Sequence, residues 1–256
     1  MAKVFLDLGM IRIPVLHLFL DIVLTIIIIM NKAQKIIEYY TLTQKLKNQI
    51  RTGWQDWRVT GDRLESVAEH VYGVQMLAIA MYSEYCYIFD LKKVILMLAI
   101  HELEETMIGD LTMFMISREE KQEKAHKAIS KILAPLAIGD ELLDLILEFD
   151  ERKTEEARFA FFCDKLECDL QAKLYDEEQR VILFGQENIA TTANGEVREL
   201  LRSGKSWSEM WLTFSQNQYQ YDENFLEVSN YALNHPIGIN KQESSWDPLA
   251  KTAKTK

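Results

Sequence analysis

Proline and glycine are scarce in this chain. Its 256 residues include 4 prolines and 10 glycines. A β-sandwich or barrel needs a turn roughly every 8–12 residues, and these two residue types form many of those turns. The scarcity therefore favours long helices. No strand-like alternation persists along the chain and no repeat is visible, so we predict an all-α fold with a single domain over residues 31–234.

The spacing of apolar residues predicts where the helices lie. A clear helical stripe lies within the helix predicted for 63–85, and a very apolar helix is predicted for 91–105. Ser117 with Glu120 three residues later forms a capping-box pattern that opens a helix ending near Leu133. The remaining helices are expected over 31–50, 140–149, 154–178, 196–203, 206–217 and 222–234, with a loop over 180–195.

Charge and cysteine content limit the partners and the compartment. The chain has 29 Lys and Arg against 39 Asp and Glu, for a net charge of −10. A binder of nucleic-acid polymers usually has a basic footprint, so this class is excluded, while a local basic pocket for a small phosphate ligand stays open. Cys86, Cys163 and Cys168 form no C-x-x-C pair, which indicates reduced thiols and a cytoplasmic protein.

Residues 1–30 form an apolar leader with three interpretations. The stretch from Ile13 to Met30 is 18 residues long, the short limit for a membrane span. Asp21 near its middle would cost about 2.5–3.5 kcal/mol on insertion. The leader is a membrane anchor, an element packed on the domain, or an artefact of a start assigned upstream of Met30. At the other end, residues 235–256 are predicted to form a disordered tail.

Two histidines occur where chemistry is expected. His70 and His101 lie on the most apolar predicted helices and have acidic neighbours, and Asp164 lies among hydrophobic residues of a third helix. Buried carboxylates are costly unless they are paired or bind a metal. Two imidazoles and two carboxylates suit a divalent ion such as Mn, Fe, Co, Ni or Zn. The alternative is that both histidines are core residues hydrogen-bonded to neighbours.

Four short blocks resemble a known family. The segment 65–70, E-S-V-A-E-H, is similar to E-[SN]-V-A-E-H, and 101–105 with 109–112, H-E-L-E-E and G-D-L-T, are similar to H-D-x-x-E and G-D-[LI]-[TP]. The segment 163–166, C-D-K-L, is similar to [AC]-D-K-[LI], and 51–54, R-T-G-W, to R-x-G-W. Over residues 34–178 the chain thus resembles the HD-domain phosphohydrolases, in particular the bacterial 5′-deoxynucleotidase branch.

The resemblance implies an HD-domain helical bundle with extra C-terminal helices, and an enzyme that hydrolyses deoxyribonucleoside 5′-monophosphates to deoxynucleoside and phosphate. It implies one divalent ion (Mn, Co, Fe, Ni, Zn or Mg), a small-molecule nucleotide substrate and a homodimer. The implied metal ligands are His70, His101, Glu102 and Asp164. The implied catalytic residues are Glu105 and Asp110, and the implied substrate-binding residues are Arg51, Trp54 and Arg63.

One residue departs from the family pattern. Glu102 stands where the pattern has Asp, and its extra methylene would shift the ion or change its coordination. A non-catalytic metal- or nucleotide-binding regulator is therefore one alternative function. An HD-type dNTP triphosphohydrolase is another, although the sequence has no obvious Lys/Arg cluster for a triphosphate. Trp54 stacks on the nucleotide or packs in the core, and the aromatic residues after 178 form a core cap, a lid or a dimer surface.

Overall fold

The computed structural model describes residues 32–238 of the chain, which are mainly helical. The one β pairing in that range is an isolated bridge between Ile50 and Ser66, so the predicted all-α class is confirmed. The elements are η1 (Gln44–Lys47), α2 (Thr52–Asp56), α3 (Val67–Glu84), α4 (Leu91–Ile100), α5 (Glu105–Ile108), α6 (Arg118–Leu133), α7 (Gly139–Glu151), α8 (Glu155–Glu177), α9 (Ile189–Ala193), α10 (Gly195–Arg202), α11 (Trp207–Tyr219) and α12 (Glu223–Asn234).

The contacts divide the chain into two units between Gln44 and Lys45. In the first unit a helix covers residues 32–43 and then passes into the 3-10 turn η1, so the helix predicted for 31–50 is shorter than expected. The second unit, from Lys45 onward, contains every residue predicted for the site. The predicted leader and most of the predicted tail lie outside the described residues. Among the helices of residues 32–238 we find none with the length and hydropathy that a membrane span requires.

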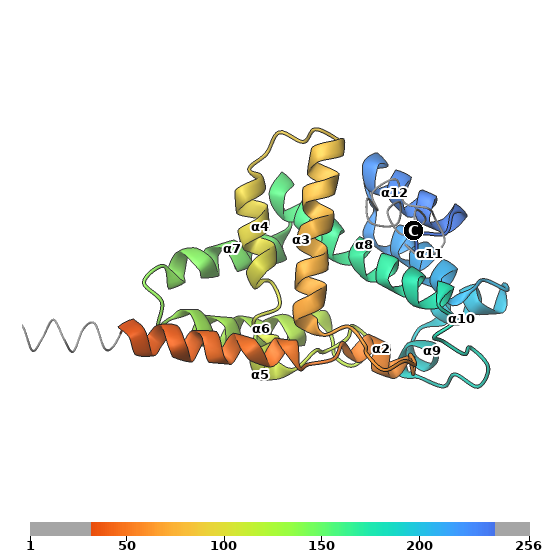
Figure 1. The fold of residues 1–256 in the computed structure, drawn as a ribbon, viewed down its shortest axis with the longest axis horizontal. Coiled ribbons are helices and arrows are strands. Elements are labelled where there is room, and N and C mark those ends of the chain that lie inside the picture. Colours follow the sequence, from red (N-terminus) through yellow and green to blue (C-terminus); the bar gives the residue numbers. More distant parts are fainter. Residues whose placement is uncertain (1–31, 239–256) are drawn as a thin grey trace, which may run out of the picture. The chain divides into compact units, whose positions relative to one another are not determined.

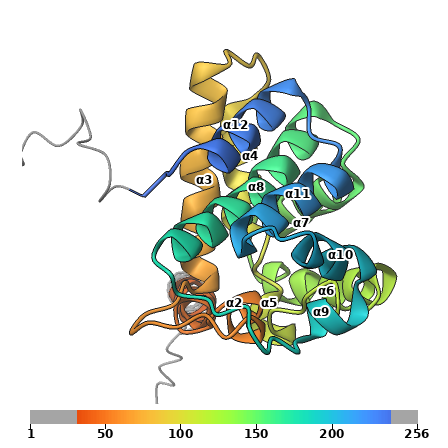
Figure 2. The same ribbon diagram turned by 90° about the vertical axis from the view of Figure 1, so that its right-hand side faces the viewer.

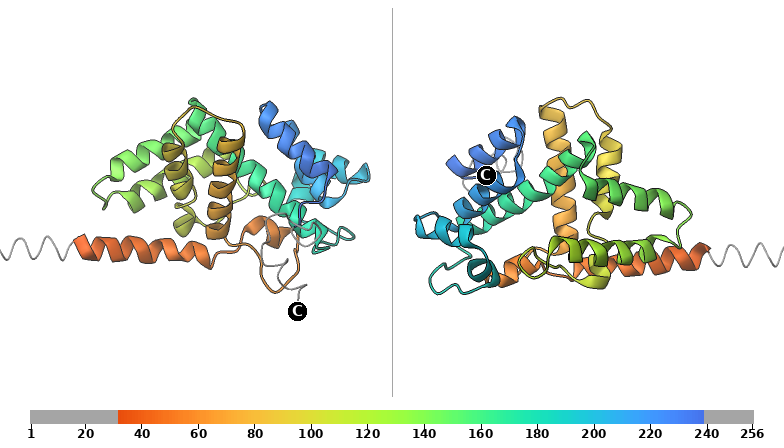
Figure 3. Two further views of the ribbon diagram at one scale, coloured as in Figure 1. Left: turned by 45° about the horizontal axis from the view of Figure 1, so that its top comes forward. Right: turned by 180° about the vertical axis from the view of Figure 1, so that it is seen from behind.

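Helix α8 organises the second unit. It packs against α3, α4, α7, α11 and α12 and runs among these helices in Figures 1 and 2. Its apolar face forms a core with the other helices through buried residues such as Val74, Leu98, Leu166 and Phe225. Helices α6 and α7 are neighbours, and the rear view in Figure 3 shows them as a pair. The predicted helices at 140–149 and 154–178 are thus α7 and α8.

Polar caps determine where the helices begin. The Ser66 hydroxyl accepts a hydrogen bond from the Glu69 N–H, and the Glu69 carboxylate accepts one from the Ser66 N–H. This reciprocal capping box starts α3 at Val67, four residues later than the helix predicted from 63. Ser117 caps α6 by accepting from the Glu120 N–H, which is one half of the predicted capping box.

The helix predicted for 91–105 is interrupted at His101. Helix α4 ends at Ile100, a turn follows, and α5 begins at Glu105. The turn is tight because the Leu103 N–H bonds the Ile100 carbonyl and the Glu105 N–H bonds the Glu102 carbonyl, both three residues back. Successive side chains in a regular α-helix point about 100° apart. The adjacent His101 and Glu102 side chains nevertheless converge, with His101 Nε2 3.7 Å from Glu102 Oε1.

The segment predicted as a loop over 180–195 contains the short helix α9, which is a correction. Asn188 starts it with a capping box to Thr191, a pattern that uses Thr in place of the usual Glu or Gln and so escapes a search for S/T-x-x-E/Q. The segment joins a second core that contains the buried Trp54 and Trp57. Trp207 and Phe214 are buried in the same core, so aromatic residues after 178 pack in the interior.

A buried acid on α8 predicts a pH-dependent stability. Asp169 accepts hydrogen bonds from the Ser215 and Tyr221 hydroxyls, and burial raises its pKa well above the usual value. The neutral form therefore predominates in the folded state, and its contribution is lost as pH rises from near 4 toward the raised pKa. We expect Asp169→Asn to gain stability relative to the wild type between pH 5 and pH 8, by at most about 1.4 kcal/mol per pH unit.

Urea unfolding of the two proteins at several pH values measures this difference. A free energy of unfolding whose difference between the two proteins stays constant from pH 5 to pH 8 would show that Asp169 has an ordinary pKa in the folded state.

Candidate metal centre

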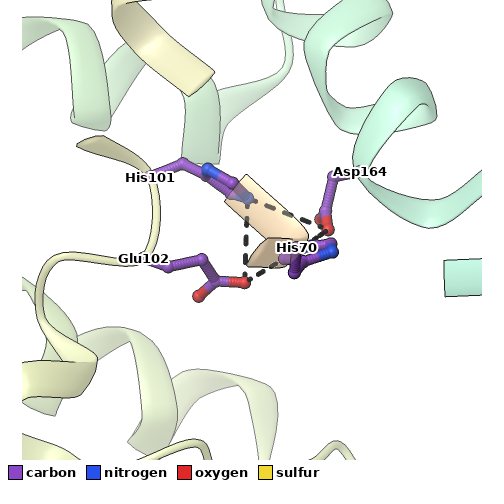
Figure 4. A group of neighbouring side chains, drawn as sticks. All are labelled: His70, His101, Glu102 and Asp164. Atoms are coloured by element: carbon purple, nitrogen blue, oxygen red, sulfur yellow. Dashed lines mark hydrogen bonds and ion pairs between the residues drawn. The ribbon is translucent and has the colours of Figure 1, made fainter. Parts of the chain in front are cut away.

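Four side chains from three segments meet in the second unit. His70 comes from the first turn of α3, His101 and Glu102 from the turn after α4, and Asp164 from the middle of α8 (Figure 4). One ligand atom from each lies within 4.8 Å of the others. The Asp164 Oδ1 is 3.1 Å from His70 Nε2 and 3.9 Å from His101 Nε2. We call these four residues the candidate metal centre.

His101 has the proton arrangement of a metal ligand. Its Nδ1 donates to the Leu98 carbonyl at 2.7 Å, which leaves a lone pair on Nε2. That Nε2 is buried and makes no hydrogen bond with the described residues, although it faces Glu102 Oε1 at 3.7 Å. An unpaired buried nitrogen is costly, and a cation placed between it and the carboxylates removes that cost. The residues present therefore fit a divalent ion.

His70 is oriented by a residue that the sequence did not single out. Its Nδ1 donates to Glu167 Oε2 at 2.5 Å, so its Nε2 faces the centre. A carboxylate behind a metal-binding imidazole fixes the tautomer and the ring orientation. Burial lowers the pKa of His70, but the acidic groups around it raise it well above its usual value. The surroundings therefore favour a positive charge beside Nε2, supplied by a proton or by a metal ion.

Glycine 73 makes the approach of Glu167 feasible. It lies within α3, one turn beyond His70, and a Cβ at this position would be 2.3 Å from Glu167 Oε1 and 3.1 Å from its Cδ. Glycine inside a helix costs about 1 kcal/mol relative to alanine. Here the missing side chain leaves the space that the carboxylate occupies. The motifs do not predict Gly73 or Glu167. These two residues orient a candidate ligand and are not ligands themselves.

Glu102 reaches the centre despite its additional methylene. Its Oε1 is 3.8 Å from His70 Nε2 and 3.7 Å from His101 Nε2. Burial raises its pKa, but the charges of His101, Lys121 and Arg51 outweigh burial and lower the pKa to about 2. Glu102 is therefore ionised in the folded protein, as a metal ligand must be. The pKa of Asp164 is also low, because Lys165 and the two histidines outweigh its burial.

The two predicted catalytic acids flank the centre. Glu105, the first residue of α5, is 2% exposed, and its Oε1 lies 3.9 Å from Lys121 Nζ. Burial, with the charges of Glu102 and Asp110, raises its pKa well above the usual value. Asp110 Oδ2 accepts the Thr52 N–H at 2.7 Å and lies 4.0 Å from Arg51 Nε. The structure therefore brings both acids beside the four candidate ligands.

The three predicted substrate-binding residues have different positions. The Arg51 Nη1 lies 3.4 Å from Glu102 Oε1, and its Nη2 donates to Cys168 Sγ, so Arg51 lies at the centre. The Trp54 ring borders the cavity described below but is 2% exposed, and its Nε1 donates to Glu65. Arg63 is not brought to the centre. Its side chain is 80% exposed and pairs with Glu69 of the capping box that starts α3.

A cavity of about 590 Å³ opens beside the centre. Its lining includes His101, Glu102 and Asp164, aromatic residues of α11 such as Trp211, and five cationic side chains. These cations are Arg51, Arg118, Lys121, Arg152 and Lys165. The Lys/Arg cluster that is absent from the linear sequence is thus assembled by folding, because the five residues come from four separate segments. The lack of a Lys/Arg cluster in the linear sequence therefore does not count against a polyphosphate substrate.

Comparisons with known proteins agree with this geometry. A family model described as HD domain matches residues 43–220. The 5′-deoxynucleotidase HDDC2 of Dictyostelium discoideum is 33% identical over 150 residues, which cover 56% of this chain and 78% of the relative. Human 5′-deoxynucleotidase HDDC2 is 28% identical over 148 residues, which cover 57% and 70% of the two chains.

Solved structures share the fold. A protein of Pyrococcus horikoshii superposes with a TM-score of 0.56 at 21% identity, over 77% of this chain and 98% of the other. A protein from Magnetospirillum magnetotacticum, described as a predicted metal-dependent phosphohydrolase, gives 0.55 at 18% identity, over 80% and 94%. The family model spans well over half of the sequence and includes all four candidate ligands. The chain therefore belongs to the HD domain family.

Proposed function

We propose that this protein is a metal-dependent phosphohydrolase that converts deoxyribonucleoside 5′-monophosphates to deoxynucleoside and orthophosphate. The observation that carries the proposal is the unpaired, buried Nε2 of His101 facing His70, Glu102 and Asp164. The reaction class and the substrate are supported by the similar proteins that are named 5′-deoxynucleotidases. The cavity and its cations offer room and charge for a nucleotide.

His70, His101, Glu102 and Asp164 would hold one divalent ion. Two imidazoles and two carboxylates suit Mn, Fe, Co, Ni and Zn, whereas Mg prefers a set made of oxygen alone. When bound, such an ion supplies Lewis acidity toward the phosphoryl group and lowers the pKa of water. The longer side chain at 102 is compatible with this role, because its Oε1 lies within 3.8 Å of both imidazole Nε2 atoms.

The remaining residues have distinct proposed roles. Arg51 holds non-bridging phosphate oxygens, since its guanidinium lies at the centre and stays charged. Glu105 lies beside the centre, where it orients the attacking water and, in its ionised form, receives the proton of that water. Asp110, held by the Thr52 N–H, assists the departing 5′-oxygen. Trp54 supports the cavity from the core rather than presenting an open face to the substrate.

Phosphate release from ribo- and deoxyribonucleoside mono-, di- and triphosphates tests the proposal. The protein is assayed with Mn²⁺, Co²⁺, Mg²⁺ or Zn²⁺, with a chelator arm as the control. We expect orthophosphate from deoxyribonucleoside monophosphates in the presence of a transition metal, and none with chelator. If no monophosphate releases orthophosphate while metal stays bound, the proposal is overturned and a non-catalytic nucleotide-binding regulator is favoured.

A further inference from the structure

Two of the five cavity cations have no acidic partner. The other three each pair with a carboxylate of the centre or beside it. These pairs are Arg51–Glu102, Lys121–Glu105 and Lys165–Asp164, with N–O separations of 3.4, 3.9 and 2.8 Å. Arg118 and Arg152 form no ion pair with any other residue in the described range of 32–238. The charge of these two arginines is therefore available to a ligand.

Arg152 is held in an unusual conformation. It caps the C-terminus of α7 with φ 55°, in the left-handed region that favours glycine. Its guanidinium lies 3.6 Å above the Phe161 ring, and its Nε is buried without a hydrogen-bond partner among the described residues. A strained backbone and an unsatisfied buried donor are both costly. Both costs fall on one residue that lines the cavity.

Arg118 adds a second charge to the same part of the cavity. It is the first residue of α6, its side chain is exposed, and it lines the cavity together with Arg152. Burial and the nearby charge of Arg118 lower the pKa of Arg152, as expected for two cations that line one cavity. Like charges held close together are unfavourable, and an anion between them reverses the sign of that interaction.

The acidic side chains near Arg118 and Arg152 lie beyond ion-pair distance of both arginines. Asp150 Oδ2 bonds His126 Nε2 at 2.6 Å, and it lies beyond ion-pair distance of either arginine. Asp164 pairs with Lys165 and faces the two histidines. Glu104 also lines the cavity, but it lies beyond ion-pair distance of either arginine.

We propose that Arg118 and Arg152 form a subsite for a second phosphate group, distinct from the phosphate that is hydrolysed at the candidate metal centre. Guanidinium groups bind phosphate oxygens in a bidentate manner, and stacking on Phe161 leaves the edge of the Arg152 guanidinium free to do so. The group bound is a further phosphate of the nucleotide or free orthophosphate. This inference rests on the proposed function, because it assumes that the hydrolysed phosphate lies beside His101 and Asp164.

Arg152→Gly is a suitable test because glycine accepts the backbone conformation at this position without strain. We expect its thermal unfolding temperature to equal or exceed that of the wild type. Lys153→Ala is the matched control, since Lys153 is the next residue, is exposed, pairs with Glu151 and does not line the cavity. Arg118→Ala tests the second arginine independently.

The first measurement is calorimetric binding of pyrophosphate to the metal-loaded protein, which does not require turnover. We expect Arg152→Gly and Arg118→Ala each to weaken binding about tenfold, and Lys153→Ala to leave it unchanged. Unchanged binding in both arginine variants would overturn the subsite. An equal loss in Lys153→Ala would also overturn it, because the effect would then be general electrostatics.

The second measurement separates the two sources of phosphate. The KM of a deoxyribonucleoside monophosphate is compared with the inhibition constants of the corresponding diphosphate and of orthophosphate. A larger inhibition constant for the diphosphate alone in Arg152→Gly supports a further phosphate of the nucleotide, and weaker orthophosphate inhibition alone supports the free anion. A monophosphate KM that rises as much as the two inhibition constants would overturn the proposal, because both arginines would then serve the hydrolysed phosphate. Absence of all hydrolysis with pyrophosphate binding intact would count against the proposed function only.

Discussion

Asp164→Asn is expected to lower the affinity for a divalent ion by at least about 100-fold and to reduce phosphate release in proportion, since loss even of a supporting group costs about 10–100-fold. Asp164 is the carboxylate that faces both imidazoles, with Oδ1 at 3.1 and 3.9 Å from their Nε2 atoms. Asparagine has nearly the same shape but no charge. The substitution also leaves Lys165, now 2.8 Å from Asp164 Oδ2, without its anion.

The matched control is Asp169→Asn. Asp169 is a second buried aspartate on α8 and is not among the four residues of the candidate metal centre, although it lines the cavity. Metal content is measured by elemental analysis after dialysis, and phosphate release is measured on the same samples. Metal binding should survive in Asp169→Asn. Full metal content and full activity in Asp164→Asn would remove Asp164 from the ligand set and with it the proposed centre.

Gly73→Ala is expected to lower metal affinity about 10–100-fold without destabilising the fold. The three atoms nearest to an added Cβ all belong to Glu167, the closest at 2.3 Å. The carboxylate must therefore swing away, and His70 Nδ1 loses its 2.5 Å hydrogen bond. Helix propensity acts in the opposite direction, since alanine within a helix is favoured over glycine by about 1 kcal/mol.

Two measurements separate these effects. Calorimetric titration with Mn²⁺ or Co²⁺ gives the affinity, and urea unfolding of the metal-free protein gives the stability. Gly195→Ala is the control, because its Cβ would meet nothing closer than Arg198 Nη2 at 3.8 Å. An unchanged titration in Gly73→Ala would mean that Glu167 does not determine how His70 binds metal. A large loss of stability would mean that the helices move instead of the carboxylate.

The ligands could be predicted from sequence because each belongs to a short local block. His70 lies in an apolar helix, His101 in another, and Asp164 stands out as an acid among hydrophobic residues. The motifs supplied their order, and the structure places them within 4.8 Å of one another. Helix boundaries were less accurate. The turn at His101 could not be read from the sequence, because no proline or glycine marks it.

The supporting residues could not be predicted for a different reason. Glu167 acts on His70 across 97 positions of sequence, and Gly73 matters only because of where Glu167 lies. The cation cluster depends in the same way on the packing of α6, α7 and α8 around one cavity. Arg63 was predicted for the site because it adjoins a motif, but the structure does not bring it there. Its side chain pairs with Glu69 and does not reach the centre.

The position of α8 links metal binding to the global stability of the protein. This helix carries Asp164 and Glu167, and it also packs on five neighbouring helices that form the apolar core. Local fraying cannot carry these residues apart, so amide exchange within α8 should require opening of the whole unit. Occupancy of the centre then adds to global stability by about 1.4 kcal/mol for each tenfold excess of free ion over its dissociation constant. The melting temperature of the protein thereby reports the free ion concentration relative to the dissociation constant, and it keeps rising after the centre is fully occupied.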